Sequence, residues 1–147
     1  MSNLLIEMGN TALKAVWAEG DTLGKTIRYQ GEKTIEFIQH ITEKEKPNVM
    51  VLASVRDKSS QDEYVLKTLC RELVLIDKKH PSILRAYGLP EYLSPDRAAG
   101  VIAVRKLFAG RECIVFDFGT LLSIDFISED GSYLGGNVSL GCRTRVK

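Results

Sequence analysis

The chain has 147 residues, of which 44% are hydrophobic and 27% are charged, and its formal net charge is +1. This length suits one compact domain, or one domain with part of another. The balanced charge excludes a field strong enough to draw nucleic acid, and no apolar run reaches the length of a membrane span. We therefore expect a cytoplasmic protein that binds neither nucleic acid nor membrane.

The first third of the chain predicts antiparallel strands, then a helix and a buried strand. Apolar patterning between turn residues predicts a three-stranded meander over residues 4–29, whose third strand covers residues 22–29. A helix is expected over residues 34–44, because isoleucines recur there on one helical face and Pro47 follows. The continuous apolar run at 49–55 is typical of a strand covered on both faces.

The middle of the chain predicts two helices that flank a strand and a loop. A capping box marks the first helix, since a serine and an acidic residue three positions later can satisfy each other's backbone N–H groups. A serine N-cap followed by proline marks the second helix. The expected elements are a helix capped by Ser60 and Glu63, a strand at 73–76, a loop at 77–93, and a helix from Ser94 and Pro95 to Gly110.

The opening pattern starts again in the last third of the chain. Strands are predicted at 113–118, at 121–128 and from Tyr133 onward, as a structural echo of the first three strands. This repetition predicts an α/β fold with two related domains of mixed sheet and helices. We expect a complete first domain at residues 1–110 and an incomplete second domain at residues 111–147.

One short phrase occurs twice, each time at the end of an apolar strand. It reads Glu7-Met8-Gly9-Asn10-Thr11 in the first copy and Asp117-Phe118-Gly119-Thr120 in the second. An acidic side chain there can hold a cation, Gly permits a tight turn, and the following N–H and hydroxyl groups can bind phosphate oxygens. The alternative is a pair of ordinary hairpin turns, because Gly and Asn are common turn formers. Two copies favour a phosphate site.

The cysteines and histidines do not predict a metal site. Cys70, Cys113 and Cys142 lie far apart and lack neighbours at the spacing of metal ligands. We expect reduced thiols, with Cys70 and Cys113 buried. His40 and His80 are isolated in the sequence, which favours structural roles over catalysis for both.

With these motifs in this order, the chain resembles the type III pantothenate kinase family of the acetate and sugar kinase, chaperone and actin superfamily. The family pattern has two phosphate motifs, a substrate motif Gly-x-Asp-Arg between them, and a Gly-Gly-x-Ile-x-Pro-Gly segment near the nucleoside. The last two match Ser94-Pro95-Asp96-Arg97 and the segment Gly135–Gly141, and Tyr87 and Pro90 match a Tyr and Pro ahead of the substrate motif. The resemblance implies a ribonuclease H-like mixed sheet flanked by helices.

The resemblance also implies a reaction. Family members transfer the γ-phosphoryl group of ATP to the primary hydroxyl of pantothenate, which gives 4'-phosphopantothenate in the first step of coenzyme A biosynthesis. ATP with Mg²⁺ and a monovalent cation, K⁺ or NH₄⁺, are the implied cofactors. A homodimer is the implied assembly.

Residue roles follow from the same resemblance. Asp96 is the implied catalytic base, Asp117 the ligand of the monovalent cation, and Arg97 a contact of pantothenate, where its planar fork suits a carboxylate. The implied ATP contacts are Glu7, Met8, Gly9, Asn10, Thr11, Ala12, Leu13, Lys14 and Thr120, and the implied substrate contacts are Tyr87, Ser94, Pro95, Asp96 and Arg97. For Asp96 an alternative is structural, because an acidic residue in the first turn complements the helix dipole.

The sequence departs from the family pattern at several positions. Glu7 stands for Asp, Ser94 for Gly and Leu140 for Pro, and Leu121-Leu122-Ser123 replaces small, Thr-rich residues. Family chains also continue for about a hundred residues more. We therefore expect a truncated chain with little turnover of its own, whose second sheet leaves an apolar face uncovered.

Two other functions stay open. One is a catalytically weak or inactive relative that acts as a regulatory or binding protein, which the substitutions would suit. The other is a phosphotransferase of the same superfamily that acts on a different small hydroxylated acid. Asp96, Arg97, Asp117 and Thr120 favour the kinase, and Tyr87 favours pantothenate.

Overall fold

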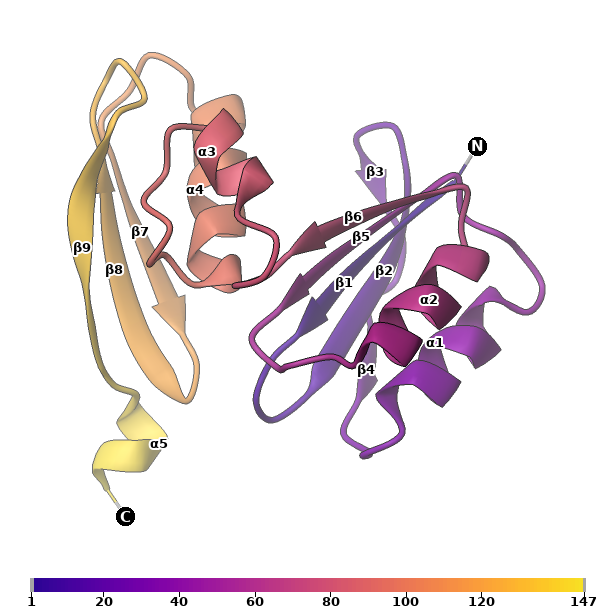
Figure 1. The fold of residues 1–147 in the computed structure, drawn as a ribbon. Coiled ribbons are helices and arrows are strands. Elements are labelled where there is room, and N and C mark those ends of the chain that lie inside the picture. Colours follow the sequence, from indigo (N-terminus) through magenta and orange to yellow (C-terminus); the bar gives the residue numbers. More distant parts are fainter. Residues whose placement is uncertain (1, 147) are drawn as a thin grey trace. The chain divides into compact units, whose positions relative to one another are not determined.

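The computed structural model describes residues 2–146, which fall into two compact units (Figure 1). Unit 1 comprises Met1–His80 and unit 2 comprises Pro81–Lys147. The helix at Pro95–Leu107 packs on strands of unit 2. The two units therefore meet after His80, whereas the expected domain boundary lies after residue 110. The assignment of residues 1–110 and 111–147 to two related domains stays a prediction.

Unit 1 is a mixed sheet with two helices. Strand β1 lies at its centre, antiparallel to β2 and parallel to β5, and the strand order is β3-β2-β1-β5-β6 with β4 also paired to β2. Figure 1 shows α1 and α2 side by side on one face of this sheet. The elements are β1 (Asn3–Met8), β2 (Leu13–Glu19), β3 (Thr22–Leu23), β4 (Ile27–Tyr29), α1 (Thr34–Thr42), β5 (Val49–Ser54), α2 (Ser60–Thr68) and β6 (Glu72–Ile76). The predicted fold class is confirmed.

The core of unit 1 lies between the sheet and its helices. In β1 every second side chain is buried, namely Leu4, Ile6 and Met8, as the two-residue period of a strand requires. Ile38 of α1 and Leu66 of α2 are fully buried in the same cluster. Burying five such side chains stabilises the unit by roughly 1.5–3 kcal/mol each, relative to leaving them exposed.

Several predicted boundaries in unit 1 were wrong. The predicted third strand is two strands, because β3 and β4 pair with different ends of β2. The capping box is formed one residue earlier, by Ser59 and Asp62. Helix α2 also ends at Thr68, which leaves residues 72–76 for β6. Of the cysteines, Cys70 is buried, but Cys113 is half-exposed and not buried as expected.

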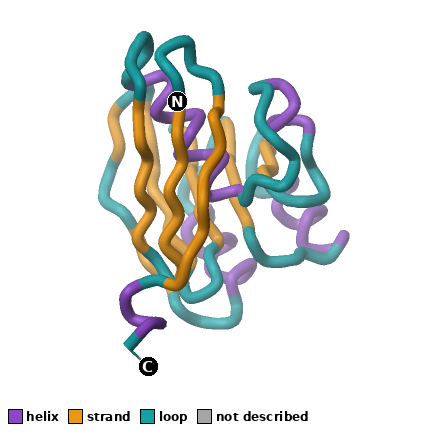
Figure 2. Tube along the Cα trace, turned by 90° about the vertical axis from the view of Figure 1, so that its left-hand side faces the viewer, coloured by secondary structure: helices purple, strands orange, loops and turns teal. Residues whose placement is uncertain are grey.

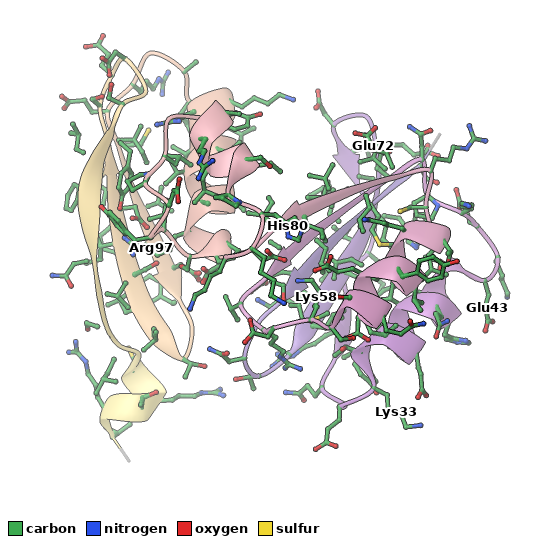
Figure 3. The ribbon with its side chains drawn as sticks, viewed as in Figure 1. Lys33, Glu43, Lys58, Glu72, His80 and Arg97 are labelled. Carbon is green, nitrogen blue, oxygen red and sulfur yellow. The ribbon has the colours of Figure 1, made fainter. Side chains whose placement is uncertain are left out.

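A buried ion pair lies at the end of unit 1. Lys58 and Asp77 are 2.8 Å apart, and their side chains are only 4% and 8% exposed. The other oxygen of Asp77 accepts hydrogen bonds from the backbone N–H groups of Lys79 and His80 and lies 2.8 Å from Nδ1 of His80. Figure 3 labels Lys58 and His80 in this region. His80 is therefore not isolated in the structure, because both its backbone and its ring bind Asp77.

The same region contains three metal-ligand side chains. Glu63, Asp77 and His80 present ligand atoms within 4.8 Å of one another. Both oxygens of Asp77 already accept hydrogen bonds, one of them from the ammonium group of Lys58. These bonds make the cluster a hydrogen-bond network, which holds the last residues of unit 1 in place.

Asp77 is expected to make unit 1 sensitive to acid. Burial raises the pKa of Asp77, but hydrogen bonds from Lys58, His80 and the backbone outweigh burial and lower the pKa to about 2. A depressed pKa contributes stability above the unfolded pKa of about 4 and loses it as the pH falls toward 2. We expect the free energy of unfolding to fall by about 2 kcal/mol across this window. Denaturant titrations from pH 5 to 2 would measure it, and Asp77→Asn should flatten the profile.

Unit 2 is an antiparallel three-stranded sheet with helices. Its strands follow chain order, β7-β8-β9, as a meander that repeats the start of unit 1. Helix α4 packs on β7 and β8. The elements are α3 (Ser82–Ala86), α4 (Pro95–Leu107), β7 (Cys113–Phe118), β8 (Leu121–Ile127), β9 (Tyr133–Leu140) and α5 (Cys142–Arg145). The predicted loop at 77–93 was wrong in part, because it contains α3.

One face of the β7–β9 sheet carries exposed apolar side chains. Strand pairing places Ile114 opposite Phe126 and puts Phe116 and Phe118 on the same face, and these side chains are 43–72% exposed. This face is turned toward the viewer in Figure 2. The expected apolar surface is confirmed, and an exposed patch of this kind favours association. Among the described helices, none is both long and apolar enough to span a bilayer.

Candidate functional site

The first predicted phosphate turn joins β1 to β2. The N–H of Gly9 donates to the carbonyl of Ala12 over 3.1 Å, which closes the turn. A Cβ atom at residue 9 would lie 3.3 Å from that carbonyl oxygen and 3.4 Å from Oε1 of Glu7. The turn is thus tight enough to favour glycine, whose backbone can also approach a ligand closely.

The predicted ATP contacts in this turn differ in exposure. Met8, Ala12 and Leu13 are buried core side chains, so only their backbone atoms could reach a ligand. Asn10, Thr11 and Lys14 are exposed, and Glu7 and Gly9 are half-buried; these five form the accessible part of the predicted set.

Glu7 and Lys14 form an ion pair across the β1–β2 ladder. They are register partners, and Nζ of Lys14 lies 2.8 Å from Oε2 of Glu7. Their side chains are 41% and 52% exposed, so the pair adds little stability. It keeps a lysine charge beside the turn, where a phosphate oxygen could replace the carboxylate.

The second predicted phosphate turn joins β7 to β8 in unit 2. The N–H of Gly119 donates to the carbonyl of Leu121 over 2.9 Å. The carbonyl of Thr120 accepts bonds from the N–H of Gly141 and the hydroxyl of Thr144, each over 3.0 Å. A side chain at residue 141 would overlap this turn, so the glycine-rich segment after β9 supports it.

Asp117 is the residue for which the family resemblance implies a role as cation ligand. It is exposed at the end of β7, opposite Ser123 of β8. Carboxylate, carbonyl and hydroxyl oxygens are ligands that suit a hard cation, and this end of the sheet supplies all three kinds. The donor set is compatible with K⁺, and the role of Asp117 stays a prediction.

The predicted substrate motif begins helix α4. Ser94 occupies the N-cap position, and its carbonyl accepts the first helical bond, from the N–H of Ala98. Its side chain makes no capping hydrogen bond to a described residue. In Asp96, the atom Oδ1 is buried and has no hydrogen-bond partner among the described residues. A buried carboxylate oxygen without a partner is costly, so this atom needs a partner beyond the described residues, such as water or a ligand.

Arg97 is held by a buried network. Its Nη2 and Nε atoms lie 2.6 Å and 3.2 Å from Oδ1 of Asp125, and the two side chains are 10% and 1% exposed. Tyr133 donates to the same Asp125 oxygen over 2.8 Å. Figure 3 labels Arg97 beside the β7–β9 sheet. Hydrogen bonding to Asp125 raises the pKa of Arg97, and burial followed by Asp125 raises the pKa of Tyr133 to about 12.

This network was missed from the sequence, and it bears on the predicted role of Arg97. Two of the three guanidinium nitrogens already bind Asp125, so Nη1 is the nitrogen left to meet a substrate carboxylate. The one available signal was an acidic residue within the apolar strand 121–127, where a buried charge needs a partner. The contact of Arg97 with pantothenate stays a prediction.

Tyr87 lies beside the other half of α4. Its carbonyl accepts a 2.6 Å bond from Nη1 of Arg105, which is nine residues after Asp96, or about 13 Å along a helix. A cavity of about 540 Å³ opens there, with Tyr87, Arg105 and Tyr133 in its lining. The structure therefore places the backbone of Tyr87 beside Arg105, in the second half of α4, and not at the start of that helix.

Gly136 is required by the Arg97 network. A Cβ atom there would lie 2.6 Å from Nη2 of Arg97 and would overlap the carbonyl oxygen of Ile124. Gly136→Ala is expected to lower the free energy of unfolding by about 1–3 kcal/mol. Gly100→Ala is the control, because its Cβ would have an ordinary 3.7 Å contact and alanine favours a helix. Equal stability of the two variants in denaturant titrations would contradict this packing.

Comparison with known proteins finds relatives that match almost the whole of this chain. Curated type III pantothenate kinases are 28% identical over 146 residues in Bacteroides fragilis, 26% over 145 in Porphyromonas gingivalis and 31% over 149 in Flavobacterium johnsoniae. Each alignment covers 98–99% of this chain, and the chain spans about 60% of the length of these relatives.

Solved structures support the fold. A crystal structure described as a Baf family transcriptional activator from Campylobacter jejuni has a TM-score of 0.58 at 19% identity. The match covers 95% of this chain and 55% of the chain in that structure. A ROK hexokinase from Thermus thermophilus has a TM-score of 0.52 at 13% identity, with 91% and 48% covered. These likenesses show the fold alone, a mixed α/β sheet with helices. Because the model of the type III pantothenate kinase family matches residues 3–147, the chain belongs to that family.

Proposed function

We propose that this chain carries the phosphate turns and the substrate motif of a kinase that phosphorylates pantothenate with ATP. The observation that carries the proposal is the buried Oδ1 of Asp96, which has no partner among the described residues and precedes the anchored Arg97. Family membership, and relatives that carry the name type III pantothenate kinase, support the choice of substrate.

In the proposed reaction Asp96 orients the acceptor hydroxyl. The hydroxyl oxygen forms a bond to the γ-phosphorus, the bond from that phosphorus to the bridging oxygen breaks, ADP leaves, and the hydroxyl proton passes to Asp96. The transition state of phosphoryl transfer is loose, so alignment and charge stabilisation matter more than a strong base. The Arg97–Asp125 bonds fix the first turn of α4, which holds Asp96 in place.

Each predicted phosphate turn supplies donors for phosphate oxygens. In unit 1 these are the backbone N–H groups of Asn10 and Thr11 and the ammonium group of Lys14, and in unit 2 the hydroxyl of Thr120. Mg²⁺ bound with ATP, and K⁺ or NH₄⁺ at Asp117, would neutralise phosphate charge. The homodimer and the cytoplasmic location also remain predictions.

A second function has specific support. Glu7 is paired with Lys14, and most of the Arg97 fork is occupied by Asp125. These features favour a member that binds the ligands and transfers phosphate slowly, as a regulatory or binding protein would.

Calorimetric titration distinguishes a pantothenate kinase, or a regulatory protein that binds the same ligands, from a phosphotransferase that acts on another substrate. The proposal expects pantothenate and MgATP to bind, and glucose, as a sugar acceptor, to give no heat of binding. Binding of both ligands with no product would support the regulatory alternative. Failure of both pantothenate and MgATP to bind would contradict the proposed function.

A further inference from the structure

Arg56 binds the backbone of the first phosphate turn. Its Nε atom donates to the carbonyl of Gly9 over 2.7 Å, and its Nη2 atom donates to the carbonyl of Asn10 over 2.9 Å. The planar guanidinium group thus holds two consecutive peptide units through one rigid fork. No motif of the sequence pointed to this residue, which lies 46 positions after Asn10.

The parallel pairing of β1 and β5 brings Arg56 to this place. Met8 is paired with Ser54, and the N–H of Val55 donates to the carbonyl of Met8 over 3.2 Å. Residue 56 therefore follows β5 where the turn follows β1. A basic side chain at this position reaches the turn without a long loop.

Arg56 is itself anchored. The buried hydroxyl of Ser54 accepts a bond from the N–H of Arg56 over 3.2 Å and donates to its carbonyl over 2.9 Å. Ser54 is 2% exposed at the end of a central strand, so the guanidinium group has a rigid base. Because the side chain of Arg56 is half-buried, it loses less conformational entropy when its hydrogen bonds form than an exposed arginine would.

These bonds set the direction of two backbone donors. In a planar trans peptide unit, the carbonyl and the N–H of the next residue point in opposite directions. The Gly9 carbonyl shares its unit with the N–H of Asn10, and the Asn10 carbonyl shares its unit with the N–H of Thr11. Because Arg56 holds both carbonyls, both N–H groups point away from Arg56, as successive donors of an anion-binding turn do.

We propose that Arg56 is a positioning residue for phosphate binding. It keeps the Asn10 and Thr11 peptide units oriented so that their N–H groups, and not the carbonyl oxygens of Gly9 and Asn10, meet the phosphate oxygens of ATP. This inference rests on the proposed function. Loss of the fork lets these peptide units rotate and present carbonyl oxygens that repel phosphate.

The test compares Arg56→Ala and Arg56→Lys with Arg71→Ala, which removes an exposed arginine of the same unit. Titrations would use MgATP, inorganic tripolyphosphate and adenosine. We expect Arg56→Ala to weaken binding of MgATP and tripolyphosphate about tenfold, as the loss of charge-assisted hydrogen bonds should, and to leave adenosine binding unchanged. Lysine keeps the charge but lacks the fork, so Arg56→Lys should not restore affinity. Arg71→Ala should match wild type.

Amide NMR gives a second readout that needs no ligand. We expect the Nε–H of Arg56 to exchange slowly with water, and we expect Arg56→Ala to broaden the Asn10 and Thr11 amide signals while Leu4 and Leu52 keep theirs. Wild-type affinity for MgATP in Arg56→Ala, or full rescue by lysine, would overturn the inference and leave the proposed function standing. If wild type binds neither MgATP nor tripolyphosphate, the proposed function fails and the inference fails with it.

Discussion

Asp96→Asn is expected to slow pantothenate phosphorylation about 10²–10⁴-fold, the usual effect of removing a positioned general base. The amide has the shape of the carboxylate but cannot take the hydroxyl proton. Because Oδ1 of Asp96 is buried without a partner among described residues, substitution should disturb few contacts. Pantothenate affinity should therefore change much less than the rate. Initial rates by mass spectrometric detection of product, with calorimetric titration beside them, measure both quantities.

Glu91→Gln provides the matched control for this experiment. Glu91 is an exposed carboxylate in unit 2 whose partner is Arg85, also exposed. Its substitution should leave the rate unchanged. Turnover by Asp96→Asn at the wild-type rate would remove the role of Asp96 as a base and leave the binding roles of the other residues in place.

Asp125→Ala is expected to destabilise unit 2 by about 3–5 kcal/mol, because it leaves the buried Arg97 guanidinium without its partner. The hydroxyl of Tyr133 loses the same acceptor. Loss of the network should also free the first turn of α4 and so lower the rate of transfer. Amide hydrogen exchange in β7–β9 measures the stability of this unit, and the fluorescence of Trp17, which lies in unit 1, serves as an internal reference.

Two further variants make this prediction specific. Arg85→Ala breaks an exposed ion pair of the same unit and should barely change the exchange rates. The double variant Arg97→Met with Asp125→Leu removes both charges, so it should lose less stability than Asp125→Ala alone. Equal losses in the single and double variants would contradict an energetic role for the pair.

Much of the fold could be predicted because local sequence patterns determine where its strands and helices form. The alternation Leu4, Ile6, Met8 places β1 on a core, and Pro95 after Ser94 marks the start of α4. Both predicted phosphate motifs lie in turns between strands, as expected from the apolar strand that precedes each, and their phosphate role stays a prediction. The boundaries were less accurate where two signals compete, as at residues 59–63, where adjacent serines offer two capping frames.

The contacts that shape the candidate site could not be predicted from local pattern. Arg97 and Asp125 are 28 positions apart and meet because α4 packs on β8. Lys58 and Asp77 are 19 apart and meet because β5 and β6 are parallel neighbours. Arg56 reaches the first turn only because β5 runs parallel to β1. Sequence motifs identified residues with reactive groups, whereas the network that orients them comes from tertiary structure.

The most direct test of the central claim is detection of 4'-phosphopantothenate after incubation with pantothenate, MgATP and K⁺. The account predicts a small amount of product that depends on ATP and pantothenate, increases with K⁺ over Na⁺, and is lost in Asp96→Asn. Absence of product together with absence of binding of either substrate would contradict it.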